Sequence, residues 1–415
     1  MSEFIILGAG MIGVSTALEL QARGHEVTLV DRREPGRETS YGNAGIIQTE
    51  AAEPYPLPRD VATLLAYALG QKNDVTYDVP GLLQMAPALW TYFRSSTPER
   101  HRRISHFYAQ LTARATDDHA DWIEAAGAQS LIRKDGYYQA YRDQAAFDEA
   151  VRKAARFMDE YGIPSDILDG PELAAKEPAL KKQVAGAVHW HDSWTCSDPG
   201  ALTAAYAQLF QARGGRLLTG DAVTLLPMQN SGWRVLTDEG PVEASQCVVA
   251  LGPWAPRLLS LLGYRIPMVF KRGYHGHFDA PSTLSRPLMD VAHGVLLCPM
   301  RQGLRMATGA ALVATDAPPK PRQLSRGVEA VADLIELGPR VNEPQWYGMR
   351  PCMPDMLPLI GQAPHHRGLW FNFGHGHQGF TLGPTSAKLL VQAIDREQSE
   401  LLGALDPSRR GAVMD

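Results

Sequence analysis

The hydrophobic pattern of the first thirty residues changes its period twice. Residues 4–7 (Phe-Ile-Ile-Leu) form a short apolar run, residues 12–23 place apolar side chains at broadly helical spacing, and residues 26–30 form a second apolar run that ends at Asp31. A continuous apolar run is typical of a strand buried on both faces, and a helical pattern between two such runs is typical of a βαβ unit. This opening predicts a parallel sheet with a helix packed on it and favours a nucleotide-binding domain.

The pattern differs between residue 53 and about residue 177. Several prolines precede two apolar and aromatic stretches of helical spacing, at 82–93 and 107–123, and a strand-like segment follows at 136–141. We interpret this part of the chain as an insertion that builds a second domain. For the apolar segment 55–110, which carries a basic patch at 100–103, we expect helical core packing with a solvated charged end, and the alternative is contact with a membrane or a partner.

The rest of the chain alternates short strands with helices. The expected elements are a strand at 185–190, a helix at 201–213, strands at 216–219, 233–237 and 246–251, a strand-rich stretch from 263 to about 315, a helix at 328–337, a strand at 369–373 and a helix that ends near 395. The three strands after residue 215 are spaced like a small β-meander. The whole pattern predicts an α/β protein of two domains.

The composition is that of a globular protein and argues against some partners. The 415 residues are 45% hydrophobic and 20% charged, and the formal net charge is −5. A chain of this length exceeds one ordinary core. The net negative charge gives no general attraction to phosphate backbones or anionic lipid, so nucleic acid is not an expected partner.

Cysteine usage and the length of the apolar runs bear on the compartment. Cys196, Cys247, Cys298 and Cys352 lie far apart without a CxxC pair, which fits free thiols in a reducing compartment. The N-terminal segment lacks the basic region and cleavage site of a signal peptide. No apolar run approaches the roughly 20 residues that a membrane span requires. We expect a cytoplasmic protein whose membrane contact, if any, is peripheral.

A glycine fingerprint lies between the first strand and the first helix. The segment Gly8-Ala9-Gly10-Met11-Ile12-Gly13 matches GxGxxG, and Asp31 ends the second strand. The first glycine permits the tight turn, the second lets a pyrophosphate approach the backbone, and the third lets helix and strand pack closely. The helix N-terminus offers amide donors and a positive dipole end to the phosphates. Asp31 is expected to accept hydrogen bonds from ribose hydroxyls.

The fingerprint does not choose between FAD and NAD, because both carry the adenosine diphosphate half that it recognises. Arg32 and Arg33 suggest a 2′-phosphate, but Asp31 in the ribose position disfavours one. The alternative, that the glycines serve turn and packing geometry alone, is disfavoured by the strand, helix and carboxylate around them.

Further motifs point to the cofactor by resemblance. They are Thr39-Ser40-Tyr41-Gly42-Asn43-Ala44-Gly45, Ala222-Val223, residues 248–254, Lys271-Arg272-Gly273-Tyr274, Gly348-Met349-Arg350-Pro351 followed by Asp355 and Pro358, and Gly374-His375-Gly376. In this order they resemble the FAD-dependent amino-acid oxidoreductases of the D-amino-acid oxidase superfamily, most of all the bacterial D-amino-acid dehydrogenases. The likeness spans residues 4–395 and implies FAD as the cofactor.

The expected fold is a Rossmann-type FAD-binding domain interleaved with a mixed α+β substrate domain. We assign 1–50, 197–265 and 340–415 to the first and 51–196 and 266–339 to the second. The residues predicted to bind FAD are Gly8, Gly10, Ile12, Gly13, Asp31, Arg32, Ser40, Asn43, Ala44, Gly45, Val223, Gly252, Gly374, His375, Gly376, Gln378 and Gly379. For Ser40 and Asn43 the alternative is turn chemistry.

The loop GHGHQG at 374–379 follows an apolar strand. A glycine loop that feeds a helix N-terminus suits an anion, and the resemblance places this loop at the pyrimidine edge of the flavin, where the reduced ring carries its charge. The His-x-His pair has ligand potential, but no carboxylate or cysteine stands beside it, so no metal is expected. His377 and Gln378 replace residues that are small or apolar in broad-specificity D-amino-acid dehydrogenases. With these two residues the loop weakly resembles that of enzymes that act on cyclic imino acids such as D-hydroxyproline.

Three residues are predicted to act on the substrate. Arg350 is expected to bind the substrate carboxylate, with a structural ion pair as the alternative. Tyr274 is expected to close the site or bond the carboxylate, with a half-buried strand tyrosine as an equal alternative. His377 is expected to bond the cofactor or line the substrate cavity, or to be satisfied by its neighbours. Arg305 is a second candidate for the carboxylate, but it is expected to face outward from a strand. His277 is expected to point away from the Tyr274 side.

The predicted reaction is hydride transfer from Cα of a D-amino acid or cyclic D-imino acid, of the D-proline or D-hydroxyproline type, to flavin N5. We expect non-covalent FAD, because Cys352 does not match the flavin-linking cysteine of the related sarcosine oxidases. One rival is an NAD-dependent dehydrogenase, which leaves the loop at 374–379 unexplained. Another is a non-catalytic FAD-binding subunit of an electron-transfer complex. The sequence indicates neither the electron acceptor nor the oligomeric state.

Overall fold

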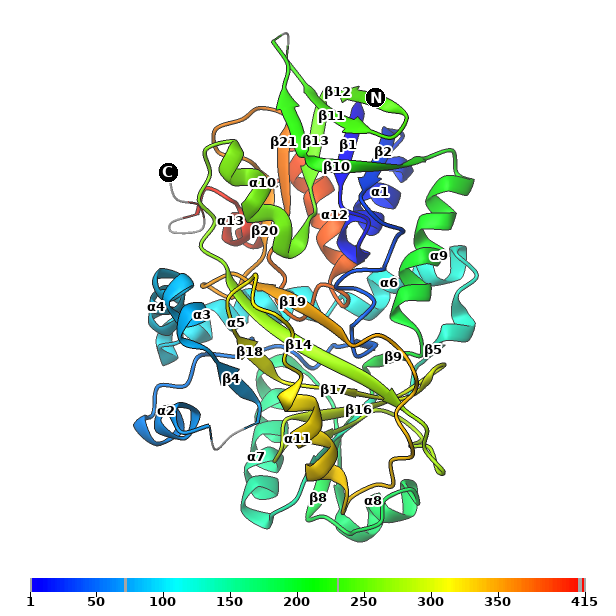
Figure 1. Cartoon of the computed structure of the whole chain (residues 1–415), viewed down its shortest axis with the longest axis vertical. Helices are drawn as coiled ribbons and strands as arrows, with labels where there is room; N and C mark the ends of the chain where they lie inside the picture. The colour runs from blue at the N-terminus through cyan, green and yellow to red at the C-terminus, as the bar shows by residue number, and fades with distance from the viewer. Residues whose placement is uncertain (1, 71–72, 230, 410–412, 414–415) are drawn as a thin grey trace.

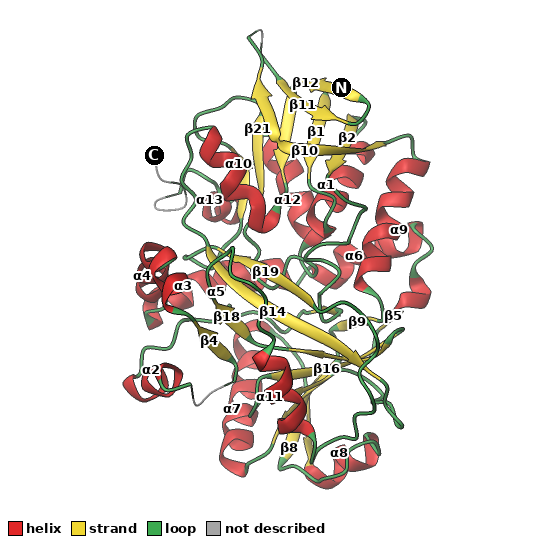
Figure 2. Cartoon of the chain, viewed as in Figure 1, coloured by secondary structure: helices red, strands yellow, loops and turns green. Residues whose placement is uncertain are grey.

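The computed structural model describes residues 2–70, 73–229, 231–409 and 413. Two large sheets lie one above the other along the long axis of the molecule (Figure 1). A small third sheet, formed by β3 (Ile46–Ile47), β9 (Trp194–Cys196) and β5 (Ile132–Arg133), contributes further strands. Figure 2 shows that helices surround the upper sheet and cover the lower one.

The upper sheet joins segments that are far apart in the sequence. Its order is β12-β11-β10-β2-β1-β13-β21-β20. The bounds are β1 (Glu3–Leu7), β2 (Glu26–Asp31), β10 (Arg216–Pro227), β11 (Trp233–Thr237), β12 (Gly240–Ala244), β13 (Gln246–Val249), β20 (Leu359–Gln362) and β21 (Leu369–Phe373). The strands from β10 to β21 pair in parallel, and antiparallel pairs complete both ends. The predicted parallel opening is confirmed. The predicted meander is only partly right, because its third strand is β12, and the strand predicted at 246–251 is β13, which pairs in parallel between β1 and β21.

Alternate side chains of β1 enter two different cores, as strand geometry requires. Phe4 and Ile6 pack against one group of helices, and Ile5 and Leu7 pack against α10 and the meander on the other face. The helices of the first group are α1 (Met11–Ala22), α5 (Pro98–Thr112), α6 (Ala115–Ala125), α9 (Pro199–Ala212), α12 (Gly383–Ile394) and α13 (Glu400–Leu405), and α10 spans Ala255–Leu261. Burial on both faces explains why β1 reads as a continuous apolar run.

The lower sheet has the order β4-β18-β14-β17-β16-β15-β6-β8-β7, with β19 paired to β14. Its bounds are β4 (Val75–Tyr77), β6 (Tyr137–Tyr141), β7 (Asp166–Asp169), β8 (Gly186–Trp190), β14 (Val269–Phe278), β15 (Leu288–Asp290), β16 (Val295–Met300), β17 (Gly303–Ala307), β18 (Ala310–Leu312) and β19 (Trp346–Cys352). One face packs on α7 (Gln144–Tyr161), and the other on α8 (Gly170–Lys176) and α11 (Arg322–Val331).

The structure corrects several predicted helix bounds. The helix predicted at 82–93 is two helices, α3 (Val79–Gln84) and α4 (Ala86–Ser95), because Pro87 cannot continue a helix from the preceding turn. The single stretch predicted at 107–123 is likewise divided between α5 and α6. The helix predicted at 328–337 is α11, which begins directly after Pro321. The predicted mixed α/β fold is confirmed.

The apolar segment around residues 55–110 is only partly in the core. Tyr92 and Tyr108 are buried as expected, but α2 (Val61–Ala68) buries no side chain, and Val61 and Leu65 are exposed. The expectation of core packing is therefore wrong for α2. Within the described ranges, the structure contains no helix that is long and apolar enough to cross a bilayer.

The predicted domain boundaries stay a prediction, and the packing crosses them in two places. β19 lies in the lower sheet beside β14, although 340–415 is assigned to the FAD domain. Helices α5 and α6 come from the predicted insertion, yet they pack into a core of the upper sheet. The two sheets are thus built from strongly interleaved segments.

Candidate active site

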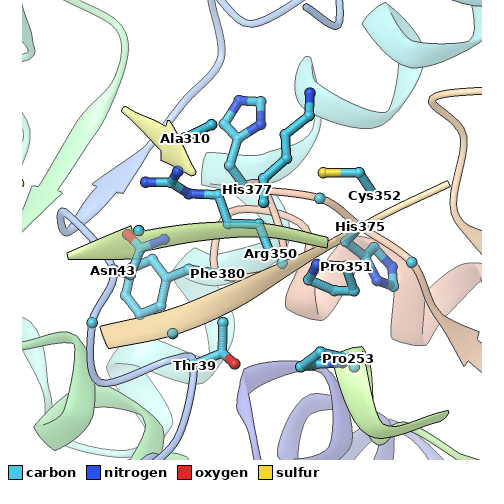
Figure 3. A pocket seen from close by; sticks show the side chains of 18 of the residues that line it. Thr39, Asn43, Pro253, Ala310, Arg350, Pro351, Cys352, His375, His377 and Phe380 are labelled. Atoms are coloured by element: carbon cyan, nitrogen blue, oxygen red, sulfur yellow. The ribbon is translucent and has the colours of Figure 1, made fainter. Parts of the chain in front are cut away.

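A cavity of ≈ 1010 Å³ lies between the two sheets. Its walls come from the turn after β1, the loop at 38–44, the segments 220–223 and 250–254, and the loop at 372–380. Ligands of open α/β sheets bind beyond the carboxyl ends of the parallel strands, where β1, β13 and β21 end here. Figure 3 shows Thr39 and Pro253 at one side of this cavity and Arg350 and His377 at the other.

The glycine fingerprint has the predicted geometry. Gly8 has a φ of +106°, and a Cβ there would lie 2.7 Å from the carbonyl oxygen of Ala250. A Cβ on Gly13 would lie 1.7 Å from the carbonyl oxygen of Gly8. Gly13 thus packs behind the cavity, whereas Gly8, Gly10 and Ile12 line it.

Asp31 holds the fingerprint turn through its carboxylate. Oδ2 accepts from the amide of Ala9 at 2.6 Å, and Oδ1 accepts from the amide of Arg33 at 3.0 Å. Burial raises the pKa of Asp31, and these two hydrogen bonds oppose the rise. Arg32 lines the cavity, where it pairs with Glu38 at 2.8 Å. Asp31 lines the cavity as well, in the position expected for a ribose-binding carboxylate.

The loop at 39–45 is braced by the side chains that were predicted there. Ser40 Oγ accepts from the amide of Met11 at 2.9 Å, and Asn43 Oδ1 accepts from the amide of Gly45 at 2.8 Å. Turn chemistry is therefore present at Asn43, whereas Ser40 bonds the first residue of α1, and both residues line the cavity together with Ala44. Gly45 faces away, because a Cβ there would lie 2.2 Å from the carbonyl oxygen of Cys196.

Arg305 does not face outward, and that expectation is wrong. Its side chain is 2% exposed, and its Nη1 donates to the carbonyl oxygens of Tyr41 at 3.0 Å and Asn43 at 2.5 Å. A guanidinium satisfies several carbonyl acceptors at once, which makes its burial tolerable. Arg305 thereby ties the cavity loop to the lower sheet.

Three potential metal ligands, His275, His277 and Glu343, approach one another beneath this loop. Their hydrogen bonds argue against a metal. His277 Nδ1 lies 2.9 Å from the Glu343 carboxylate, and its Nε2 accepts from Arg305 Nε at 3.0 Å. An imidazole that accepts at Nε2 carries its proton on Nδ1 and offers no lone pair there. His277 also does not line the cavity, whereas Tyr274 does, so their opposite orientation is confirmed.

The C-terminal loop brings backbone to the cavity wall. Gly374 and Gly376 have φ values of +89° and +60° and line the cavity with His375 and Gly379. His375 is 5% exposed, and its Nε2 has no partner among the described residues. Burial lowers the pKa of His375 to about 3, so the ring is neutral at ordinary pH. An unpartnered buried nitrogen at a cavity wall is the kind of group that a bound ligand satisfies.

Of the remaining residues predicted to bind the cofactor, two line the cavity and one does not. Val223 and Gly252 line the cavity. The amide of Val223 donates to Asp221 Oδ1 at 3.1 Å. Gln378 is 1% exposed and lies behind the wall, where its Nε2 donates to Gln48 Oε1 at 2.7 Å. Its cofactor contact stays a prediction.

Arg350 stands at the lower end of the cavity without a carboxylate partner. Its Nη1 donates to the carbonyl oxygen of Gly309 at 2.6 Å, and its Nη2 to that of Thr308 at 3.0 Å. No salt bridge to Arg350 occurs in the part of the chain that the structure describes, so a structural ion pair is not found there. Burial lowers the pKa of Arg350, yet a guanidinium stays charged. An uncompensated cation facing a cavity suits a carboxylate ligand.

The absence of a side chain at Gly273 leaves space for the guanidinium of Arg350. It lies opposite Gly348 in the β14–β19 pair, and a Cβ on Gly273 would lie 2.8 Å from Arg350 Nη2 and 3.0 Å from its Cζ. Tyr274 is 3% exposed, and its hydroxyl accepts from the amide of Lys320 at 3.1 Å. Its predicted role at the substrate stays a prediction.

Sequence reasoning missed several groups around Arg350. Lys271 Nζ lies 2.8 Å from Tyr92 Oη and lines the cavity. Tyr55 lies with its ring centroid 5.1 Å from that of His377. Lys271 belongs to the Lys-Arg-Gly-Tyr motif at 271–274, so the sequence does carry a signal for it. Tyr55 stands in a proline-rich segment without any motif, and only the fold brings it to the cavity.

The sequence matches the family model described as FAD dependent oxidoreductase over residues 3–393. The chain belongs to this family. The FAD-dependent oxidoreductase assignment confirms the resemblance seen in the motifs, and the cavity supports it, since its glycine turn, carboxylate and unpartnered histidine nitrogen suit a dinucleotide.

Named relatives and solved structures agree over nearly the whole chain. A D-amino-acid oxidase of Bradyrhizobium diazoefficiens is 29% identical over 97% of this chain and 98% of its own length. A D-amino acid dehydrogenase of Chromohalobacter salexigens is 30% identical over 99% and 100%. Glycine oxidase from Geobacillus kaustophilus superposes with a TM-score of 0.74 at 21% identity, covering 99% and 100%. L-proline dehydrogenase from P. horikoshii superposes with a TM-score of 0.71 at 18% identity, covering 98% of this chain and 97% of that chain. These two structures show the shared fold.

Proposed function

We propose that this FAD-dependent oxidoreductase oxidises a D-amino acid or a cyclic D-imino acid of the D-proline or D-hydroxyproline type. The observation that carries the proposal is Arg350, a partly buried cation that lines the cavity and has backbone carbonyls as its protein partners. The D configuration rests on the names of the curated relatives. FAD, bound without a covalent link, supplies the hydride acceptor at N5.

The residues of the chain have two tasks at this site. Arg350 binds the substrate carboxylate through both Nη atoms and so fixes the direction of Cα. Lys271 and Arg350 together place positive charge near the substrate amine. A nearby cation lowers the pKa of an ammonium group and favours the neutral amine, whose lone pair assists the loss of hydride. Neither task requires a general acid or base.

The first test is an anaerobic absorbance spectrum of the purified protein before and after addition of D-proline, cis-4-hydroxy-D-proline and a panel of linear D-amino acids. Bleaching of the flavin bands by one of these classes supports the proposal. Bleaching by L-amino acids or glycine alone refutes the D configuration, and a flavin that no amine bleaches favours a non-catalytic subunit. Acid precipitation that leaves all flavin in the supernatant checks the non-covalent link.

The electron acceptor and the compartment are separate parts of the proposal. Comparing oxygen with a soluble quinone in the reoxidation of the bleached protein identifies the class of acceptor. Cytoplasmic location is proposed on the four cysteines, which are free in the structure and fit a reducing compartment.

A further inference from the structure

A buried carboxylate stands beside the substrate end of the cavity without taking part in the proposed chemistry. Glu50 is 5% exposed. Its Oε1 accepts from Tyr137 Oη at 2.6 Å, and its Oε2 accepts from Ser193 Oγ at 2.5 Å. An ionised carboxylate only accepts hydrogen bonds, so it dictates which atom each neighbour presents to it.

That constraint passes through two amides to His377. Gln48 presents Nε2 to Glu50, and its Oε1 is therefore left to accept from Gln378 Nε2 at 2.7 Å. The same Gln378 Nε2 lies 3.1 Å from His377 Nε2. An amide nitrogen is only a donor, so His377 Nε2 must be an acceptor.

The opposite orientation of these amides is costly. Turning Gln378 alone would set its Oε1 2.7 Å from Gln48 Oε1, where two acceptors repel. Turning Gln48 as well would direct an amide oxygen at the Glu50 carboxylate. In the observed orientation Gln378 Oε1 is buried and has no hydrogen-bond partner among the described residues.

A neutral imidazole that accepts at Nε2 carries its proton on Nδ1. Burial lowers the pKa of His377 to about 3, and the charges of Arg350 and Lys271 act in the same direction, so the ring is neutral at ordinary pH. His377 lines the cavity, and its Nδ1 neither bonds to another described residue nor belongs to the fully buried polar atoms. The Nδ1 proton is therefore available to a ligand bound in the cavity.

We propose that the relay Glu50–Gln48–Gln378 locks His377 as a hydrogen-bond donor that selects substrates carrying an acceptor oxygen, such as a hydroxyl, on the side chain or ring. The inference rests on the proposed function, because it places the substrate between Arg350 and His377. Figure 3 shows these two side chains on the same side of the cavity. His377 is thus a specificity-determining residue, and the three relay residues are positioning residues.

The relay is tested first without any turnover. Nitrogen-15 spectra of the FAD-loaded protein with labelled histidine report the tautomer of each ring, and the signal absent from His377→Phe identifies His377. The expected result is a proton on Nδ1. In Gln378→Glu a carboxylate faces Nε2, so the proton is expected to move to Nε2.

Gln139→Glu is the matched control. Gln139 lines the cavity and contacts Tyr137 Oη at 2.9 Å, but it does not touch His377. The variant adds the same charge near the same network, and the His377 tautomer is expected to stay on Nδ1. A wild-type ring with its proton on Nε2, or a tautomer that changes equally in both variants, overturns the relay.

The selection is tested by a matched substrate pair, cis-4-hydroxy-D-proline and D-proline. His377→Phe keeps a ring beside Tyr55 and removes the donor. Its kcat/KM for the hydroxylated substrate is expected to fall on the order of tenfold relative to D-proline, the size of one neutral hydrogen bond. Gln378→Glu leaves His377 itself intact, and it is expected to lower the ratio of kcat/KM for the hydroxylated substrate to kcat/KM for D-proline as well. Equal losses on both substrates overturn the selection.

Failure of the proposed function has a different signature. If neither member of the pair bleaches the flavin, the proposed substrate class is refuted, and the histidine spectra still decide the tautomer. If both are oxidised and the ratio does not respond to either variant, the proposed function stands and the selection by His377 is refuted.

Discussion

Arg350→Lys tests whether the site needs a guanidinium or only a positive charge. The Arg350 side chain is held by the carbonyl oxygens of Thr308 and Gly309, and it has no carboxylate partner within the described chain. Lysine keeps the charge but replaces a planar fork with a single ammonium. Two parallel hydrogen bonds to the substrate carboxylate then become one.

The expected loss follows from that count. A hydrogen bond to a charged group contributes about 1.5–3 kcal/mol, and roughly 1.4 kcal/mol corresponds to a factor of ten. Losing one of two such bonds therefore predicts a decrease in kcat/KM of about 10- to 150-fold. Part of the decrease is expected in the rate at saturating substrate, because a single contact fixes the direction of Cα less well.

The assay is the anaerobic bleaching of the flavin in a stopped-flow instrument over a range of substrate concentrations. Arg272→Lys is the control. Arg272 is 1% exposed, lies in the adjacent strand opposite Met349, and donates to the backbone carbonyls of Ala314 and Pro318, but it does not line the cavity. Its replacement is expected to lower stability and to leave the bleaching kinetics of the folded protein unchanged. Bleaching by Arg350→Lys with the wild-type rate and concentration dependence would refute the role of Arg350.

Two more predictions come from packing and burial. Gly273→Ala places a Cβ 2.8 Å from Arg350 Nη2, so it is expected to raise KM while FAD retention, measured from the absorbance ratio, stays unchanged; loss of FAD instead would contradict it. His119 is fully buried between Tyr206 Oη at 2.9 Å and the carbonyl oxygen of Phe380 at 3.0 Å, and burial lowers its pKa to about 4. Between pH 6.5 and about 4 the unfolded chain binds a proton that the folded chain does not, so stability is lost as the pH falls. Urea titrations at pH 7.5 and pH 5 measure the free energy of unfolding. Between these two pH values His119→Gln is expected to lose about 2 kcal/mol less of this free energy than wild type does, and equal losses in both proteins would refute the prediction.

The parts of the site that lie within one short segment were predictable. The Gly8 to Gly13 turn and Asp31 lie together beside the cavity because a strand, a turn and a helix that follow one another in sequence also meet in space. Arg305 was misplaced for the opposite reason. Its burial depends on the carbonyl oxygens of Tyr41 and Asn43, which come from a loop far away in the sequence.

The helices show the same contrast between features that the sequence carries and features that depend on the fold. Pro87 separates α3 from α4, a break that the sequence carries but that the apolar pattern alone does not show. The exposure of α2 has no local signal, because its side chains are as apolar as those of a core helix. Whether an apolar helix is covered depends on which other elements reach it.

The sequence by itself determined the parallel opening of the upper sheet, because that opening rests on local spacing. Its motifs also carried the resemblance to the FAD-dependent family, which the match to the family model confirms. Only the tertiary structure decided that Arg350 has no carboxylate partner among the described residues and that Glu50, through two amides, sets the tautomer of His377. The physical reason is that ion pairing and hydrogen-bond direction depend on which side chains meet in space, and residues 48–50 meet 377–378 only in the folded chain, because more than 300 positions separate them in the sequence.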